Sequence, residues 1–214
     1  MFDPTAARQL MVDSQLRSRG ISDQRVLDAM LRLPRDQFVP ESYRTQAYAD
    51  HPLPIGDGQT ISQPYVVALM LESLELTSTD KVLEVGTGSG YVTALLAELG
   101  EQVFSIERHP ALAQSARDVL AALGYANVHV ETGDGTLGLP ASAPFDAILV
   151  SAAAPDLPRA LLAQLRESGR MIVPVGSPDS QQLQFIRMTN GQPAISLREL
   201  VRFVPLIAST SERS

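Results

Sequence analysis

The chain has 214 residues, 44% of them hydrophobic and 19% charged, so it can form one full core with an extension. Its net charge of -7 argues against a protein that binds nucleic-acid backbones, and no apolar run reaches the ~18 residues of a membrane span. The absence of cysteine excludes disulfides, thiolate nucleophiles and zinc held by cysteine.

Residues 1–79 are predicted to form an N-terminal helical cover followed by a substrate loop. The start, MFDPTAARQL, lacks the basic region and apolar stretch of a secretion signal, so we expect a cytoplasmic protein. Asp3 followed by Pro4 is typical of a helix start. Ser22 is expected to cap a second helix, because apolar residues recur at helical spacing after it.

The loop GQTISQPY carries two closely spaced hydroxyl groups. If this segment is extended, side chains alternate, so Thr60 and Ser62 lie on one face and Ile61 on the other. A helix is predicted to begin near Pro64. A second interpretation of Ser62 stays open on spacing alone, because a serine there can cap that helix.

Residues 80–214 are predicted to form the core, and the stretch KVLEVGTGSGY organises it. A short apolar run ends in Gly86, Gly88 and Gly90 and is followed by a helical pattern, which predicts a strand, a tight turn and a helix. Glycines let the backbone adopt positive φ and approach a ligand, while the helix start points unpaired N–H groups into the turn. This arrangement suits a nucleotide-like cofactor.

Strands and helices alternate after the glycine turn. The pattern predicts further strands at 102–108, 127–135, 145–153 and 170–176, and helices at 110–124 and 157–169. Such alternation is typical of a doubly wound α/β fold, with a mostly parallel sheet covered on both faces. The segments 181–189 and 195–206 flank an Asn-Gly turn and are expected to form an antiparallel C-terminal edge.

Three acidic residues fall at the predicted strand ends, namely Glu84, Glu107 and Asp134. Glu107 lies about twenty residues past the first glycine, where an acid can accept both ribose hydroxyls of a nucleoside, in NAD or in another cofactor. The GxGxG spacing and the additional acids favour a cofactor with an ammonium and a sulfonium. Glu84 is therefore predicted to hold the ammonium of S-adenosylmethionine, and Asp134 to accept the adenine amino group, with Gly135 admitting the ring.

Several motifs together resemble the protein-L-isoaspartate O-methyltransferase family: EVGTGSGY, SIER, GDG, APFDAILVSAA, GQTISQPY and VRFVPL. The resemblance covers nearly the whole chain. It implies a seven-stranded Rossmann-like methyltransferase sheet with an antiparallel last strand pair, and S-adenosylmethionine as cofactor. It also implies methylation of the free α-carboxylate of L-isoaspartyl residues in damaged proteins and peptides, whose ester then collapses to a succinimide.

The resemblance also assigns the site residues. Its active-site serine falls on Ser62, with Thr60 beside it as a second catalytic candidate. The candidate cofactor-binding residues are Glu84, Gly86, Thr87, Gly88, Gly90, Glu107, Arg108, Asp134 and Gly135. The candidate substrate-binding residues are Ile61, Val204 and Leu206, near which backbone groups would hold an extended substrate.

An α-carboxyl titrates near ~3.5, so the substrate nucleophile is already ionised and no general base is required. Of the three histidines, we single out His51, which precedes the hydroxyl-bearing loop. We expect no metal site, no nucleic-acid or membrane partner, and a monomer that binds isoaspartyl-containing proteins and peptides.

Three alternatives stay open. The chain could be a related S-adenosylmethionine-dependent methyltransferase that acts on another carboxylate. It could also be a cofactor-dependent binder of damaged peptides without turnover. An NAD-dependent oxidoreductase fits the glycine turn alone, although no Tyr and Lys pair is placed for hydride chemistry and Lys81 is the only lysine.

Overall fold

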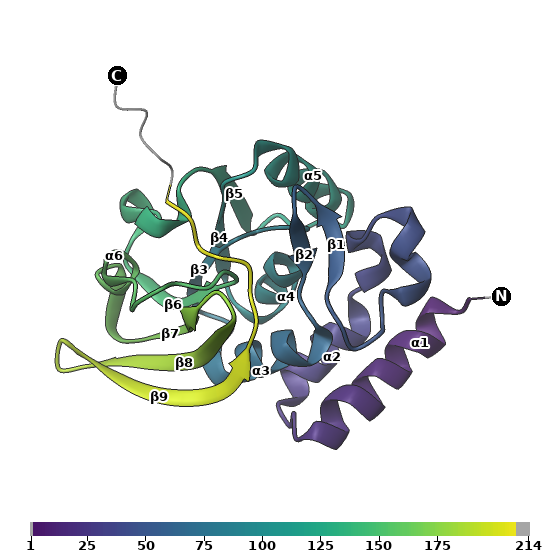
Figure 1. Cartoon of the computed structure of the whole chain (residues 1–214), viewed down its shortest axis with the longest axis horizontal. Helices are drawn as coiled ribbons and strands as arrows, with labels where there is room; N and C mark the ends of the chain where they lie inside the picture. Colours follow the sequence, from purple (N-terminus) through teal and green to yellow (C-terminus); the bar gives the residue numbers. More distant parts are fainter. Residues whose placement is uncertain (1, 209–214) are drawn as a thin grey trace.

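The computed structural model describes residues 2–208, which form a seven-stranded sheet covered on both faces (Figure 1). The helices are α1 (Pro4–Met11), α2 (Gln24–Arg32), α3 (Pro64–Leu74), α4 (Tyr91–Leu99), α5 (Pro110–Ala122) and α6 (Arg159–Leu162). The strands are β1 (Leu53–Gly56), β2 (Gln59–Ile61), β3 (Lys81–Val85), β4 (Gln102–Glu107), β5 (Val128–Thr132), β6 (Phe145–Val150), β7 (Leu165–Ser177), β8 (Ser180–Thr189) and β9 (Gln192–Val201).

The strand order in the large sheet is β5-β4-β3-β6-β7-β8-β9. Strands β3 to β7 pair in parallel, whereas β7 with β8 and β8 with β9 pair antiparallel, which confirms the predicted fold class and edge. The chain winds outward from β3 to β5 and then returns to place β6 on the other side of β3. Ligands in such folds bind at the carboxyl ends of the strands where the order reverses, here between β3 and β6.

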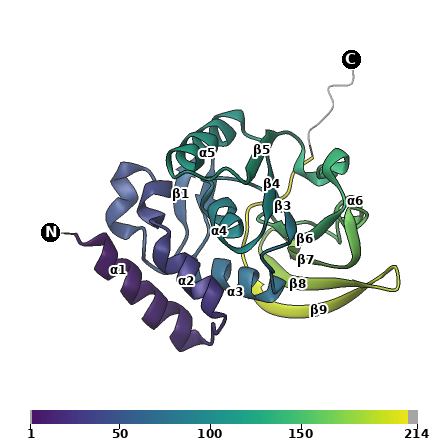
Figure 2. The ribbon, with the colours of Figure 1, turned by 180° about the vertical axis from the view of Figure 1, so that it is seen from behind.

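Alternating side chains of the central strands pack into two separate cores. Val82 of β3 packs with α3, α4 and the N-terminal helices, while the next residue, Leu83, packs with the opposite core around α6. Ala147 and Ile148 of β6 divide in the same way. Figure 2 shows α2, α3 and α4 close together on one side of the sheet. The N-terminal helices thus share a core with the sheet.

The predicted start of α1 is confirmed, because Asp3 accepts hydrogen bonds from the first N–H groups of the helix. The predicted cap of α2 is wrong by one residue. Asp23 caps the helix through its carboxylate, and the hydroxyl of Ser22 donates instead to Glu72 of α3. A carboxylate at this position also interacts favourably with the positive end of the helix dipole.

The helix predicted at 157–169 is only the four residues of α6. The following segment enters the sheet at Leu165, which pairs with Phe145 at the start of β6. Phe145 also donates its N–H to the carbonyl of Gln164. Long-range strand pairing here outweighs a favourable local helical pattern.

The segment 195–206 is not one strand, since β9 ends at Val201 and an extended tail follows. This tail, yellow in Figure 1, turns back across the sheet toward the C-terminus. Ala153, after β6, donates its N–H to the Val204 carbonyl and accepts from the Leu206 N–H. The tail is thereby fixed over the ends of the central strands. Within residues 2–208, no helix combines the length and apolar character that a membrane span requires.

Candidate active site

A cavity of about 300 Å³ lies at the carboxyl ends of β3, β4 and β6, between the β2 segment and the C-terminal tail. A second cavity, of about 640 Å³, adjoins it beside β9. The two share Thr60, Ser62, Ser151, Val204 and Pro205. Of the predicted site residues, these line the first cavity: Thr60, Ile61, Ser62, Glu84, Gly86, Thr87, Gly88, Glu107, Arg108, Gly135, Val204 and Leu206. The sequence-predicted residues thus converge on one place.

The glycine turn forms the floor of the first cavity, with Gly86 at φ 95° and Gly88 at φ 52°. Both conformations are unfavourable for residues with a side chain. A Cβ atom on Gly88 would also lie 3.2 Å from Ile55 of β1. Gly90, also predicted to bind cofactor, does not line the cavity. A Cβ there would lie 3.3 Å from Ala116, so this glycine lets α4 pack closely against α5.

Glu84, at the end of β3, is fully buried and faces the first cavity. Its Oε2 accepts hydrogen bonds from the hydroxyls of Thr93 and Ser105, whereas its Oε1 has no hydrogen-bond partner among residues 2–208. Burial raises the pKa of Glu84 to about 8, against those two hydrogen bonds, and the charge of Glu107 adds to the rise. A buried carboxyl with one unused oxygen is suited to a cationic ligand group.

Glu107, at the end of β4, is held rigidly by the backbone. Its Oε2 accepts the N–H of Gly88 and its Oε1 accepts the N–H of His109, each at 2.9 Å. A carboxylate has about four acceptor positions, so each oxygen keeps capacity for a ligand hydroxyl. The structure therefore places an oriented acceptor where the sequence predicts a ribose contact.

Asp134 lies beside the first cavity but is not among its lining residues, whereas Gly135 is. The Oδ1 atom of Asp134 caps the following turn by accepting the N–H and the hydroxyl of Thr136. A Cβ on Gly135 would lie 2.6 Å from the Val85 side chain, so the backbone passes close to the end of β3. The two residues thus shape one wall of the cavity through their loop.

Thr60 and Ser62 lie where the two cavities meet, and the structure excludes the interpretation of Ser62 as a helix cap. The residue before α3 is Gln63, and no side chain caps that helix. Neither hydroxyl makes a hydrogen bond to another residue within 2–208. Ile61 is buried, as the predicted alternation requires. The two hydroxyls therefore face the cavities instead of stabilising the local backbone.

Several lining residues were missed by the sequence analysis, among them Tyr91, His109 and Ser151. Tyr91 is the first residue of α4, and its position directly after the glycine turn is the signal that could have identified it. His51, which the sequence analysis singled out, is exposed and lies outside both cavities. His109 lines the first cavity instead, because it follows the strand that carries Glu107.

Comparison with known proteins gives one consistent family. Residues 6–211 match the family described as Protein-L-isoaspartate(D-aspartate) O-methyltransferase (PCMT). The chain is 57% identical over 202 residues to "Protein-L-isoaspartate O-methyltransferase" of Koribacter versatilis, covering 94% of this chain and 91% of that protein. It is 56% identical over 209 residues to "Protein-L-isoaspartate O-methyltransferase 1" of Syntrophobacter fumaroxidans, covering 97% of each.

Solved structures agree with these relatives. A protein titled protein-L-isoaspartate O-methyltransferase superposes with a TM-score of 0.84 at 30% identity, covering 92% of this chain and only 65% of that chain. A putative protein-L-isoaspartate O-methyltransferase from Plasmodium falciparum superposes with a TM-score of 0.82 at 28% identity, covering 94% of this chain and 98% of that one. The latter was solved in complex with S-adenosyl-L-homocysteine.

Proposed function

The chain belongs to the protein-L-isoaspartate(D-aspartate) O-methyltransferase family, and we propose how its residues divide the work of that reaction. It transfers a methyl group from S-adenosylmethionine to the free α-carboxylate of L-isoaspartyl residues in damaged proteins and peptides. The observation that supports this division of roles is the junction of the two cavities, where the hydroxyls of Thr60 and Ser62 have no hydrogen-bond partner among residues 2–208. One cavity holds the cofactor and the other admits the substrate.

The first cavity has the donor set that S-adenosylmethionine requires. The unpartnered, buried Oε1 of Glu84 fits an ammonium, and the backbone-bound carboxylate of Glu107 fits a ribose diol. Gly86 and Gly88 leave space for close approach, and Thr87 and Arg108 also line this cavity. We assign the adenine end to the loop of Asp134 and Gly135. Gly90 supports this site through helix packing.

When bound, S-adenosylmethionine supplies a methyl group on a sulfonium centre. The substrate carboxylate is ionised at neutral pH, so the protein has to position it and need not remove a proton. Ser62, with Thr60 beside it, donates a hydrogen bond to one carboxylate oxygen and leaves the other oxygen free to attack. A moderate hydrogen bond is sufficient, because a stronger one would weaken the nucleophile.

Val204 lines both cavities, whereas Ile61 and Leu206 line only the first, so these three residues border the substrate from the cofactor side. The Val204 carbonyl and the Leu206 N–H are already bonded to Ala153, so these two groups are not offered to a substrate. We propose that the side chains of the tail close the cavity against water, while outward backbone groups of the same tail contact an extended substrate segment.

The remaining assignments complete the proposal. Residues 1–79 act as the cover and substrate loop of the 80–214 core, since β2 and α3 carry the hydroxyls to the cavity. The partners are isoaspartyl-containing proteins and peptides, bound by a monomer. A cytoplasmic location and the lack of nucleic-acid and membrane partners stay predictions from the sequence.

A paired-substrate assay tests the function. Labelled S-adenosylmethionine is incubated with an isoaspartyl peptide and with the same peptide carrying a normal aspartyl residue. Methylation of the isoaspartyl peptide alone is expected. Methylation of neither peptide, or of both equally, would refute the proposed substrate.

A further inference from the structure

Arg35 is a fully buried cation that the reaction described above does not use. It lies in the 3-10 turn Arg35–Phe38, within the N-terminal cover. No carboxylate among residues 2–208 lies within ion-pair distance of it. Burying an unpaired charge is costly, so such a residue is expected to have a specific use.

The guanidinium of Arg35 binds the hydroxyl-bearing loop from behind. Its Nη2 donates to the carbonyl of Ser62 at 2.8 Å, and its Nε donates to the carbonyl of Ala47 at 2.7 Å. A charged donor makes a stronger hydrogen bond to a carbonyl than a neutral one. The peptide unit that follows the Ser62 side chain is therefore fixed to a rigid, planar group.

The same guanidinium also contacts the cofactor side of the site. Its central carbon lies 4.8 Å from the ring centre of Tyr91, the first residue of α4, which lines the first cavity. Phe38, from the same turn as Arg35, packs edge-on against this ring with centroids 5.5 Å apart. Burial lowers the pKa of Arg35, and Tyr91 partly opposes that effect. Arginine remains charged even so.

We propose that Arg35 is a positioning residue for methyl transfer, which sets the hydroxyl of Ser62 relative to the glycine turn and helix α4. The geometry carries this inference, since one planar cation contacts both the Ser62 carbonyl and the ring that begins α4. Unlike Glu84, Arg35 lines neither cavity, so it does not touch either ligand itself. It acts through the loop that carries Ser62, and this inference rests on the function proposed above for that loop.

The test is a double-mutant cycle in the full chain with Arg35→Lys, Arg35→Met, Ser62→Ala and the combined variants. Arg35→Lys keeps the charge but cannot contact the Ser62 carbonyl and the Tyr91 ring at the same time. We expect it to lower kcat for the isoaspartyl peptide about 10-fold. The Kd for S-adenosylhomocysteine is expected to stay within about threefold of wild type. In the Ser62→Ala background, the same substitution is expected to cost less than about threefold, because its effect passes through Ser62.

The matched control is Arg170→Lys, which replaces another buried arginine that donates to a backbone carbonyl, but whose partners Leu74 and Asp80 line neither cavity. It is expected to lower the Tm without coupling to Ser62. If Arg35→Met does not fold, the comparison of Arg35→Lys with and without Ser62→Ala is sufficient to test the proposal. Equal losses from Arg35→Lys with and without Ser62, or no loss of kcat, would overturn the positioning role. An inactive wild-type enzyme would instead refute the proposed function.

Discussion

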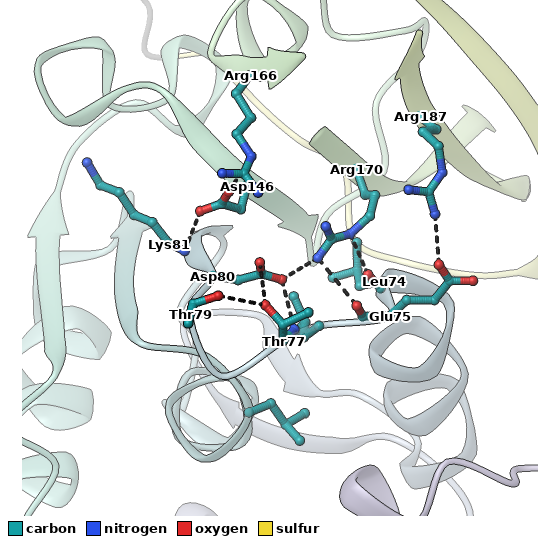
Figure 3. Close-up of polar contacts among 12 residues, drawn as sticks. Leu74, Glu75, Thr77, Thr79, Asp80, Lys81, Asp146, Arg166, Arg170 and Arg187 are labelled. Carbon is teal, nitrogen blue, oxygen red and sulfur yellow. Dashed lines mark hydrogen bonds and ion pairs between the residues drawn. The ribbon is translucent and has the colours of Figure 1, made fainter. Parts of the chain in front are cut away.

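Arg170 and Arg35 are both buried, but they lie at different ends of the sheet and have different partners. Arg170, on β7, forms an ion pair with Asp80 and donates to the carbonyl of Leu74 (Figure 3). Within the described residues 2–208, Arg35 binds only carbonyls and an aromatic ring beside the cavities. The first arginine is neutralised by a carboxylate within the protein. The second has no ion-pair partner among residues 2–208 and lies against the loop that we propose to bind the substrate carboxylate.

The surrounding acids follow the same division. At the amino ends of β3 and β6, Asp80 accepts two hydrogen bonds from Thr77, and Asp146 binds the N–H of Lys81 and the guanidinium of Arg166. At the carboxyl ends, one oxygen of Glu84 has no partner within residues 2–208. Paired buried charges hold the fold together, while incompletely paired ones are available to ligands.

The largest expected effect is on stability. Arg170→Met leaves Asp80 as an uncompensated buried carboxylate, and we expect the free energy of unfolding to fall by about 3–5 kcal/mol. Although burial opposes it, hydrogen bonds from Thr77 and the charge of Arg170 keep the pKa of Asp80 below its ordinary value. Urea denaturation measures the loss. Affinity for S-adenosylhomocysteine is expected to be unchanged.

Arg187→Met is the control, because Arg187 pairs with Glu75 at the surface, where the two side chains are 38% and 69% exposed (Figure 3). An exposed pair contributes about 0–1 kcal/mol. If Arg170→Met and Arg187→Met lower the free energy of unfolding equally, the buried ion pair stabilises the protein no more than the surface pair does, and the prediction is wrong.

The next largest effect is on cofactor affinity, at the carboxyl ends of the parallel strands. Glu107→Ala removes the acceptor of two backbone N–H groups and the proposed ribose contact, so affinity for S-adenosylhomocysteine is expected to fall about 10- to 100-fold. Calorimetric titration measures it. Glu131→Ala, which removes an exposed acid from the neighbouring strand β5, is the control and is expected to change nothing. Unchanged affinity of the Glu107 variant would mean that the ribose contact is misassigned.

Much of this carboxyl end could be predicted from the sequence, because the signals are local. The glycine turn needs positive φ, Glu107 follows at a characteristic distance, and Thr60 and Ser62 are two residues apart. Each of these properties depends on a few neighbouring residues. The strand alternation that gives the sheet is equally local, so the fold class was predicted correctly.

Features that depend on distant residues could not be predicted in this way. Arg35 stands in a stretch without periodicity, and its partner Ser62 is 27 residues away. Leu165 lies in a helical pattern, yet its pairing with Phe145 makes it part of a strand. Gly90 belongs to the glycine motif, but its neighbour Ala116 on α5 determines what it does. Such roles follow from tertiary contacts that spacing does not encode.

The third effect separates binding from transfer. Ser62→Ala is expected to lower transfer to an isoaspartyl peptide about 10-fold, because the orientation of the carboxylate is lost, while cofactor affinity stays within a few-fold. Steady-state kinetics and calorimetry measure the two quantities. Thr60→Val is the companion variant, and we expect a smaller loss. If Ser62→Ala weakens cofactor binding and transfer equally, the proposed division between the two cavities is wrong.

The smallest effect is a pH dependence of cofactor binding that arises at Glu84. Burial raises the pKa of this carboxyl to about 8 in the free protein, so it holds its proton at pH 7. Because the folded protein binds this proton more tightly than the unfolded chain, stability falls as pH rises from about 4.5 to 8. The ammonium of a bound cofactor favours the carboxylate, so binding should release the proton.

Affinity for S-adenosylhomocysteine is therefore expected to rise by just under 10-fold from pH 6 to pH 7 and to level off above pH 8. Calorimetry at pH 7 in two buffers of different ionisation enthalpy counts the protons released, and we expect close to one. Glu84→Gln keeps the shape of the side chain and cannot titrate, so it should abolish both the buffer dependence and the pH dependence. Equal heats in the two buffers for the wild type would show that binding does not change the protonation of Glu84, and hence that this buried carboxyl does not respond to the cofactor ammonium as proposed.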